Sequence, residues 1–132
     1  MKVIDVGIGL ERIPWVINGS ATSYIETFGS SYKFLNDKLG IPLENEVWNT
    51  LGPYSCKLDI DESENIDATW EEIAKIISLP VADIKRAIIP IRDLFIILDH
   101  TRTALMIITD GGLPSNTGGG SNCRNIIRRI FA

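Results

Sequence analysis

The chain has 132 residues, 45% of them hydrophobic and 23% charged, with a formal net charge of -4. This composition fits one globular domain, or the end of one domain joined to part of another, and excludes collagen-like and disordered classes. Charges and Pro90 interrupt the longest apolar region, 87–111, which excludes a membrane-spanning helix, and no secretory signal opens the chain, so we expect a cytoplasmic location.

The cysteines form no metal-binding or disulfide pattern. Cys56 and Cys123 lie far apart in a chain with one histidine. Zinc sites and disulfide frameworks need clustered Cys and His residues, so the sequence predicts no zinc and no other structural metal. We expect both cysteines to act as small packing residues.

The N-terminal segment predicts a strand followed by a short helix. Residues 1–6 include β-branched side chains and precede Gly7, which is typical of one short strand. A single strand cannot satisfy its backbone groups, so we expect it to dock on a longer parent protein or to pair between two copies in a homo-oligomer. Residues 10–17 predict a helix that ends at Asn18 and Gly19.

The next apolar residues recur with helical spacing. They predict an amphipathic helix from a cap at Ser20 or Thr22 to Gly40, weakened at Gly29. Pro42 is suited to open a further short helix.

The central segment predicts a loop and then two helical stretches. Residues 52–65 combine a Gly-Pro pair with acidic side chains, which is typical of a long loop. Asp67 or Thr69 caps the following helix. Pro80 then opens a mostly buried helical stretch that we expect to be kinked or broken at Pro90.

The C-terminal part predicts the end of the long helical stretch, a connection and a last helix. The buried stretch includes Leu105 and Ile108 and ends at 110–112, and a turn-rich connection over 113–121 leads to a final helix over 122–131. Its isoleucines share one face and two arginines another: Ile126, Ile127 and Ile130 against Arg124 and Arg128. The expected fold is mainly α, an almost entirely helical module preceded by one short strand.

Charge is distributed unevenly along the chain. The segment 44–72 is acidic and holds a single Lys57, whereas no acid follows Gly111. The charged residues beyond that point are Arg124, Arg128 and Arg129. An acidic run is usually a solvated face, while arginines beside a glycine-rich loop are suited to phosphates.

The run Asp5-Val6-Gly7-Ile8-Gly9-Leu10-Glu11-Arg12 places two glycines between the strand and a helix that presents an arginine. Glycines let a ligand approach the backbone and arginine suits a triphosphate, although Gly-x-Gly spacing alone more often marks a structural turn. The full run resembles motif 3 of the class II aminoacyl-tRNA synthetases, and its aspartate narrows the resemblance to alanyl-tRNA synthetase, in its archaeal form. The resemblance implies that Arg12 binds ATP, that Gly7 and Gly9 shape the pocket floor, and that Asp5 contacts the amino group of alanine. Val6 departs from the threonine of that family.

Further elements follow in the order of the same family: Asp99-His100-Thr101-Arg102, Asp110-Gly111, Pro114-Ser115-Asn116 and the Arg128-Arg129 helix. The resemblance implies contact with the tRNA acceptor stem, where Asn116 helps to recognise the guanine–uracil wobble pair of an alanine tRNA. It also implies a backbone or base contact for Arg128, with Arg124 and Arg129 as further candidates.

The residues themselves leave alternatives open. Asparagine carries the donor and acceptor that read a base edge, yet Asn116 after Pro114 also suits the closure of a turn, and the arginines suit a solvated face. The pair Gly120-Ser121 stands where the family has Gly-Tyr, so a stacking tyrosine is absent. We interpret Asp99 and His100 as a buried hydrogen-bonded pair or a helix-stabilising contact, without catalytic chemistry.

The resemblance divides the chain into the C-terminal end of a class II catalytic domain, 1–19, and part of a helical tRNA-recognition region, 20–132. In the parent enzyme, ATP with Mg activates alanine before its transfer to tRNA. Motifs 1 and 2, which that reaction needs, do not precede residue 1, so we expect the isolated chain to be inactive and limited to acceptor-stem binding. A piece of a full synthetase and a truncated paralogue both fit this expectation.

A helical interaction or scaffold module that binds protein through the acidic centre is the alternative function. It predicts no salt-dependent affinity for RNA, whereas phosphate contacts by arginine release counterions and make RNA affinity fall as salt rises.

Overall fold

The computed structural model describes residues 4, 6–20, 22–41, 46–58 and 65–132, apart from the side chain of Cys56. The described part is mainly helical, which confirms the mainly α part of the expected fold class. It contains no strand, and the predicted strand over 1–6 falls mostly outside the described residues.

The first two helices end where glycine permits a left-handed backbone. Helix α1 spans Arg12–Asn18 and is followed by Gly19 at φ 62°, and α2 spans Tyr24–Leu39 and is followed by Gly40, also at φ 62°. Both stops were predicted, since only glycine adopts such angles without cost from a Cβ atom. The weak point at Gly29 is also confirmed, because its φ of 43° and ψ of -109° interrupt the helical backbone of α2.

The central segment differs from its prediction. Helix α3 spans Glu46–Leu51, and a 3-10 helix, η1, spans Gly52–Leu58 where the sequence predicted a loop. The next helix, α4, spans Ile66–Ile77. Packing against α3 and α4 gives η1 the tertiary contacts that a sequence pattern does not reveal.

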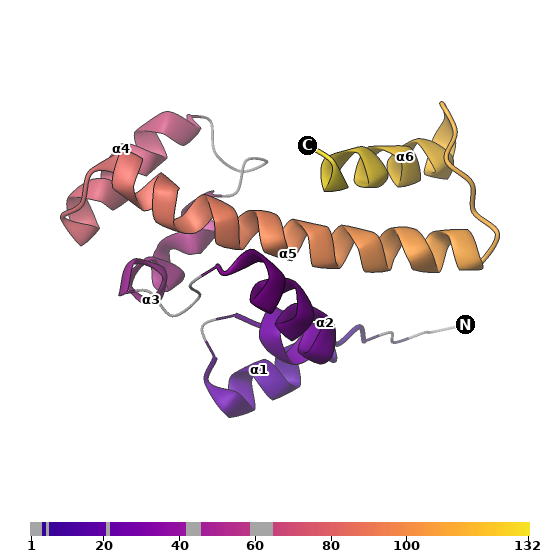
Figure 1. Ribbon diagram of the computed structural model, residues 1–132, viewed down its shortest axis with the longest axis horizontal. Helices are drawn as coiled ribbons and strands as arrows, with labels where there is room; N and C mark the ends of the chain where they lie inside the picture. Colours follow the sequence, from indigo (N-terminus) through magenta and orange to yellow (C-terminus); the bar gives the residue numbers. More distant parts are fainter. Residues whose placement is uncertain (1–3, 5, 21, 42–45, 59–64) are drawn as a thin grey trace.

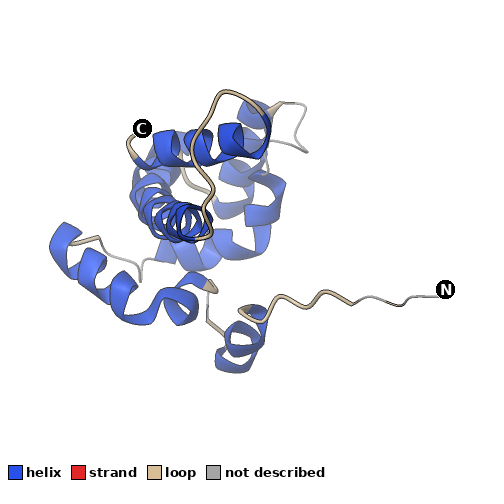
Figure 2. Cartoon of the chain, turned by 90° about the vertical axis from the view of Figure 1, so that its right-hand side faces the viewer, coloured by secondary structure: helices blue, strands red, loops and turns tan. Residues whose placement is uncertain are grey.

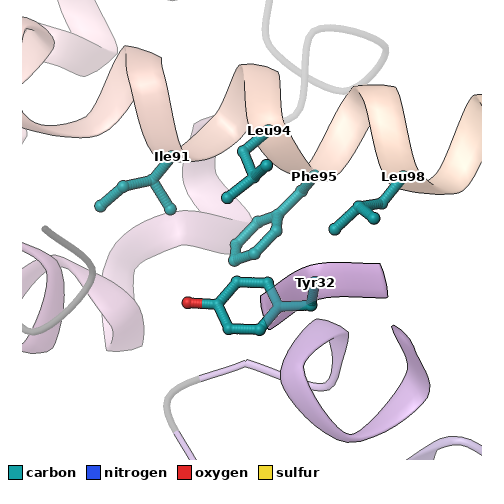
Figure 3. Packing of buried hydrophobic residues seen from close by; sticks show 5 residues of the cluster. All are labelled: Tyr32, Ile91, Leu94, Phe95 and Leu98. Carbon is teal, nitrogen blue, oxygen red and sulfur yellow. The ribbon is translucent and has the colours of Figure 1, made fainter. Parts of the chain in front are cut away.

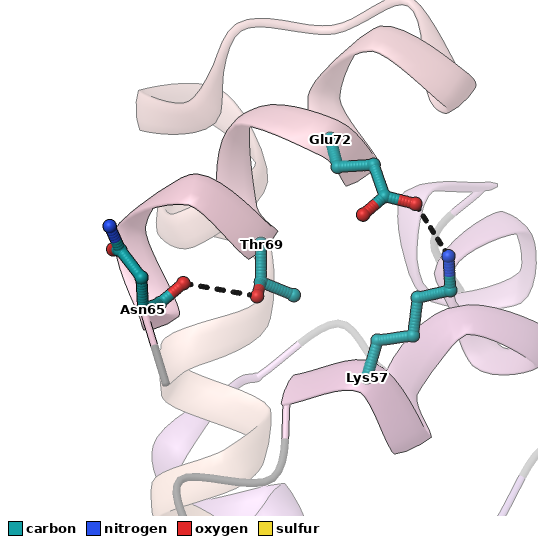
Figure 4. A network of polar contacts seen from close by, with 4 residues as sticks. All are labelled: Lys57, Asn65, Thr69 and Glu72. Carbon is teal, nitrogen blue, oxygen red and sulfur yellow. Dashed lines mark hydrogen bonds and ion pairs between the residues drawn. The ribbon is translucent and has the colours of Figure 1, made fainter. Parts of the chain in front are cut away.

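The N-terminus of α4 is capped by an asparagine that the sequence pattern did not single out. Asn65 accepts a hydrogen bond at its side-chain oxygen from the Ala68 amide at 3.2 Å, so Asp67 and Thr69 are not the caps. Thr69 instead donates its hydroxyl hydrogen to the Asn65 carbonyl (Figure 4). An ion pair between Lys57 Nζ and Glu72 Oε1, at 2.6 Å, links η1 to α4 (Figure 4).

One long helix organises the molecule. Helix α5 spans Val81–Thr109 and continues through Pro90, so the predicted break does not occur. Helices α3 and α4 surround its N-terminal half (Figure 1). In both overall views, α6 lies on one side of α5 and α1 with α2 on the other (Figures 1 and 2).

The core lies along one side of α5 in two clusters. In the first, Phe95 is the centre of an aromatic group, with its ring centroid 4.4 Å from that of Tyr24, 5.9 Å from Trp48 and 6.5 Å from Tyr32. Figure 3 shows Tyr32 facing the buried side chains of α5: Ile91, Leu94, Phe95 and Leu98. The second cluster joins α3, α4 and the first turns of α5 through Leu51, Ile73, Ile84 and Ile88.

The last helix begins earlier than expected. Helix α6 spans Gly118–Ile130, so the three glycines form its first turn instead of a connecting loop. Cys123 is fully buried, and α6 packs along the C-terminal half of α5. Leu105 and Ile108 are 62% and 45% exposed, so the prediction that they are buried is wrong, because α6 covers a different face of α5.

Candidate nucleic-acid interface

The hairpin between α5 and α6 carries the predicted tRNA-binding residues. The α5 end is closed by two hydrogen bonds, from the Gly112 amide to the Ile107 carbonyl at 2.8 Å and from the Gly111 amide to the Ile108 carbonyl at 3.0 Å. Gly111 has a φ of 88°, and this pairing is the Schellman arrangement that ends helices at glycine. The chain thus leaves α5 in a defined direction.

The connection after α5 is braced by its own serine. The Ser115 hydroxyl donates to the Thr117 carbonyl at 2.8 Å, and the Ser115 amide donates to the Gly120 carbonyl at 3.0 Å. These bonds tie the Pro114–Asn116 turn to the first turn of α6. The turn is therefore held by hydrogen bonds to Thr117, just before α6, and to Gly120, within the first turn of α6.

Gly120 is required where the turn meets α6. A Cβ atom on Gly120 would lie 2.6 Å from the Leu113 carbonyl oxygen and 2.9 Å from Ser115 Cβ. Real contacts of this kind are longer, so a side chain there would force the backbone apart. This close approach gives a structural reason for one glycine of the three-glycine run.

Asn116 and Arg124 meet in space. The Arg124 guanidinium donates from Nη1 to the Asn116 side-chain oxygen, and both residues are exposed. The sequence predicted the two residues separately, eight positions apart. Only the hairpin geometry brings the helix and the turn within hydrogen-bonding distance.

The two faces of α6 agree with their prediction. Ile126, Ile127 and Ile130 are half-buried toward α5, while Arg124, Arg128 and Arg129 are exposed. Arg128 and Arg129 line a shallow depression of about 410 Å³ with Asn125 and Ala132. No ion pair of these arginines occurs within the described residues, and no acid follows Gly111 in the sequence, so the exposed face is basic.

The predicted ATP-binding residues lie on the other side of α5. Arg12 opens α1, with its amide donating to the Gly9 carbonyl at 3.0 Å. A Cβ atom on Gly9 would lie 3.2 Å from Arg12 Nε, whereas one on Gly7 would meet open space. Asp5, the predicted alanine-binding residue, lies outside the described residues.

A cleft of about 780 Å³ is lined both by the end of the glycine-containing N-terminal segment, at Leu10 and Glu11, and by Asp99 and Arg102 of α5. It lies between α1, α2 and α5, and its lining includes Leu10, Glu11, Tyr24, Phe28, Asp99 and Arg102. Burial, with the Asp99 carboxylate adding to it, raises the pKa of the Tyr24 phenol above its usual range. No local sequence pattern indicated this cleft, because residues from three separate helices form it.

Asp99 and His100 form the expected hydrogen-bonded pair. His100 Nδ1 lies 3.1 Å from Asp99 Oδ2, and the His100 side chain is partly buried. Among the described residues, no group of three His, Cys, Asp or Glu side chains has a metal-binding arrangement. None of the described helices has the length and apolar character to cross a membrane.

Comparison with known proteins aligns nearly the whole chain with one part of several longer proteins. No protein-family profile matches it. It is 37% identical over 131 residues to the alanine–tRNA ligase of Methanocella arvoryzae, a match that covers 99% of the chain and 15% of that ligase. Its identity to the alanine–tRNA ligase of Nitrosopumilus maritimus is 35% over 131 residues, with the same two coverages.

A third archaeal protein gives the same alignment. The alanine–tRNA ligase of Methanosphaera stadtmanae is 33% identical over 129 residues, covering 98% of the chain and 14% of that ligase. The chain thus spans about one seventh of the length of the curated relatives it matches. The chain belongs to the alanine–tRNA ligase family and corresponds to one segment of its members.

Proposed function

We propose that this chain is the segment of an alanine–tRNA ligase that contacts the acceptor stem of alanine tRNA through the α5–α6 hairpin. The observation that carries the proposal is the contact of Asn116 with Arg124 of α6, a helix without acidic side chains, in a chain that aligns with these ligases over nearly all its length. Asn116 serves as the base-reading residue, and Arg128 contacts the backbone or a base.

The chemistry of the hairpin supports this assignment. An RNA helix exposes base edges and 2′-hydroxyls in a wide, shallow minor groove, flanked by phosphates. An asparagine on a hydrogen-bonded turn reaches a base edge, while Arg128 and Arg129 pair with phosphate oxygens. Such contacts make the affinity depend on salt.

The N-terminal segment is proposed to complete a class II catalytic domain. In this proposal, residues 1–19 supply a strand of the catalytic sheet, with Arg12, Gly7 and Gly9 for ATP with Mg and Asp5 for alanine, and 20–132 belong to the tRNA-recognition region. A guanidinium suits a triphosphate. The exposure of Ile4, Val6, Ile8 and Leu10, all at least 71% accessible, supports burial against other strands of the parent enzyme.

An electrophoretic titration tests the function. The chain is titrated with an alanine tRNA acceptor-stem hairpin and with a variant in which the guanine–uracil wobble pair is replaced by a Watson–Crick pair. We expect tighter binding to the wobble hairpin, by about tenfold, because a well-placed base contact is worth about 1–3 kcal/mol of discrimination. Asn116→Ala should abolish the difference between the two hairpins.

Matched variants separate this function from the scaffold alternative. Asn122→Ala changes an exposed asparagine on α6 that the proposal does not use, and it should leave the discrimination intact. Arg128→Ala should weaken both hairpins and reduce the slope of affinity against salt by about one. Absence of binding at low salt would reject RNA recognition by this hairpin and favour a protein-interaction module.

A further inference from the structure

We infer that Arg124 is a positioning residue that orients the Asn116 amide, so that Asn116 presents hydrogen-bond donors to its ligand and reads an acceptor atom. This inference rests on the proposed function and adds to it the chemistry of the atom that Asn116 contacts. The structural basis is the hydrogen bond from the Arg124 guanidinium to the Asn116 side-chain oxygen.

The orientation follows from the chemistry of arginine. The oxygen and nitrogen of an asparagine amide have nearly the same shape, and the hydrogen-bond network decides which way the group faces. A guanidinium has five N–H donors and no acceptor, so only the amide oxygen can face it. The contact therefore assigns Oδ1 to Arg124 and directs Nδ2 away from it.

The rest of the hairpin makes this orientation persistent. The turn that holds Asn116 is tied to α6 by the Ser115 amide, which donates to the Gly120 carbonyl at 3.0 Å. Arg124 stands on the second turn of the same helix, near Cys123, which is fully buried. No acidic side chain follows Gly111 in the sequence, and none of the ion pairs found among the described residues involves Arg124.

The consequence concerns the ligand atom. With its oxygen bound to Arg124, Asn116 offers two N–H groups to solvent, and these bind acceptors. In an RNA minor groove the acceptors are pyrimidine O2, purine N3 and the 2′-hydroxyl oxygen, and phosphate oxygens lie at its rim. Every base pair presents these base acceptors, so a base acceptor yields discrimination through its position, which is displaced in the wobble pair, whereas a phosphate acceptor yields equal affinity for both hairpins.

Two substitutions test the two parts of the inference. Asn116→Asp retains an oxygen for Arg124 but carries no donor, so it should lose the discrimination between hairpins, about tenfold. Arg124→Lys keeps the positive charge but loses the planar fork, so it should lose the same discrimination while the salt slope stays unchanged. Arg86→Lys, the same change at an exposed residue paired with Asp83 on α5, is the control.

A double-mutant cycle distinguishes action through Asn116 from a general structural effect of the Arg124 substitution. If Arg124 acts through Asn116, Arg124→Lys should have no further effect on the affinity for the wobble hairpin in the Asn116→Ala background. Additive losses would overturn the positioning role. Discrimination by Asn116→Asp equal to that of the unchanged chain would overturn the donor assignment.

Side-chain amide resonances test the orientation without RNA. In ¹⁵N-labelled chain, Arg124→Lys should shift the Asn116 Nδ2 signals and leave those of Asn122 in place. An unmoved Asn116 signal would refute the contact. Failure to bind either hairpin, together with the expected shift, would reject the proposed function and leave the positioning of the amide established.

Discussion

Adjacent glycines in α6 show how one residue type has different roles at neighbouring positions. A Cβ atom on Gly119 would meet no heavy atom within 4 Å, whereas on Gly120 it would come within 2.6 Å of the Leu113 carbonyl oxygen. Gly120 therefore permits the turn to approach the helix, and Gly119 has no such steric role. The sequence alone, with three consecutive glycines, does not indicate which of them has the steric role.

Gly120→Ala should destabilise the hairpin. The added methyl group overpacks the contact with the Leu113–Ser115 backbone, at a cost of about 1–3 kcal/mol in the free energy of unfolding. Urea denaturation followed by circular dichroism measures this change. Because the turn carries Asn116, the discrimination between the two RNA hairpins should also fall.

Gly119→Ala is the matched control. Alanine favours the helix over glycine by up to about 1 kcal/mol, so this variant should be neutral or more stable. Equal destabilisation by the two substitutions would show that the close approach at Gly120 is not the source of the effect.

At the scale of the element, α5 tolerates a proline in its interior. Pro90 lacks the amide hydrogen that would bond to the Arg86 carbonyl, yet the helix continues from Val81 to Thr109. Buried Ile88 and Ile91 anchor α5 on either side of Pro90, which itself is exposed. Tertiary packing therefore outweighs the local cost of the proline, from which the sequence predicts a kink or break.

Pro90→Ala should raise the stability of the chain. Restoring the backbone donor and removing the ring should recover up to about 3 kcal/mol, since this is the usual penalty for proline inside a helix. Thermal unfolding should show a higher Tm. Pro80→Ala serves as the control, because Pro80 is the N-cap of α5 and its missing donor leaves no helical bond unmade; a lower Tm for Pro90→Ala would contradict the account.

At the scale of the whole molecule, Phe95 connects three helices. Its ring lies against Tyr24 and Tyr32 of α2 and against Trp48 of α3. Phe95→Ala should lose about 3–5 kcal/mol of the free energy of unfolding, because the cavity forms where these elements meet. That is a large part of the stability of a typical domain, about 5–15 kcal/mol.

Phe34→Ala provides the comparison for Phe95→Ala. Phe34 lies on α2 and is 61% exposed, whereas Phe95 is 5% exposed. Chemical denaturation of the two variants should separate them by at least about 2 kcal/mol. Similar losses would indicate that the aromatic cluster does not organise the fold.

Features of the fold that depend on local interactions were predicted from the sequence, whereas features that depend on tertiary packing were not. Gly19, Gly40 and Gly111 end helices through their own backbone angles, so these stops were visible in the sequence. The cap of α4 was misplaced from Asn65 to Asp67 or Thr69, because all three residue types suit a cap and the packing decides the register. Leu105 was expected to be buried since apolar spacing does not tell which faces of a long helix find partners.

By itself the sequence determined the mainly helical class, the helix ends at Gly19, Gly40 and Gly111, the separation of apolar and basic faces on α6, and membership of the alanine–tRNA ligase family. These properties depend on local backbone preference, periodicity and inherited residue patterns. Only the tertiary structure brought Arg124 to Asn116, Gly120 against Leu113, and the N-terminal run to the cleft with Asp99. The physical reason is that these contacts depend on how α6 and α1 pack relative to α5, and such packing depends on the shapes of distant side chains.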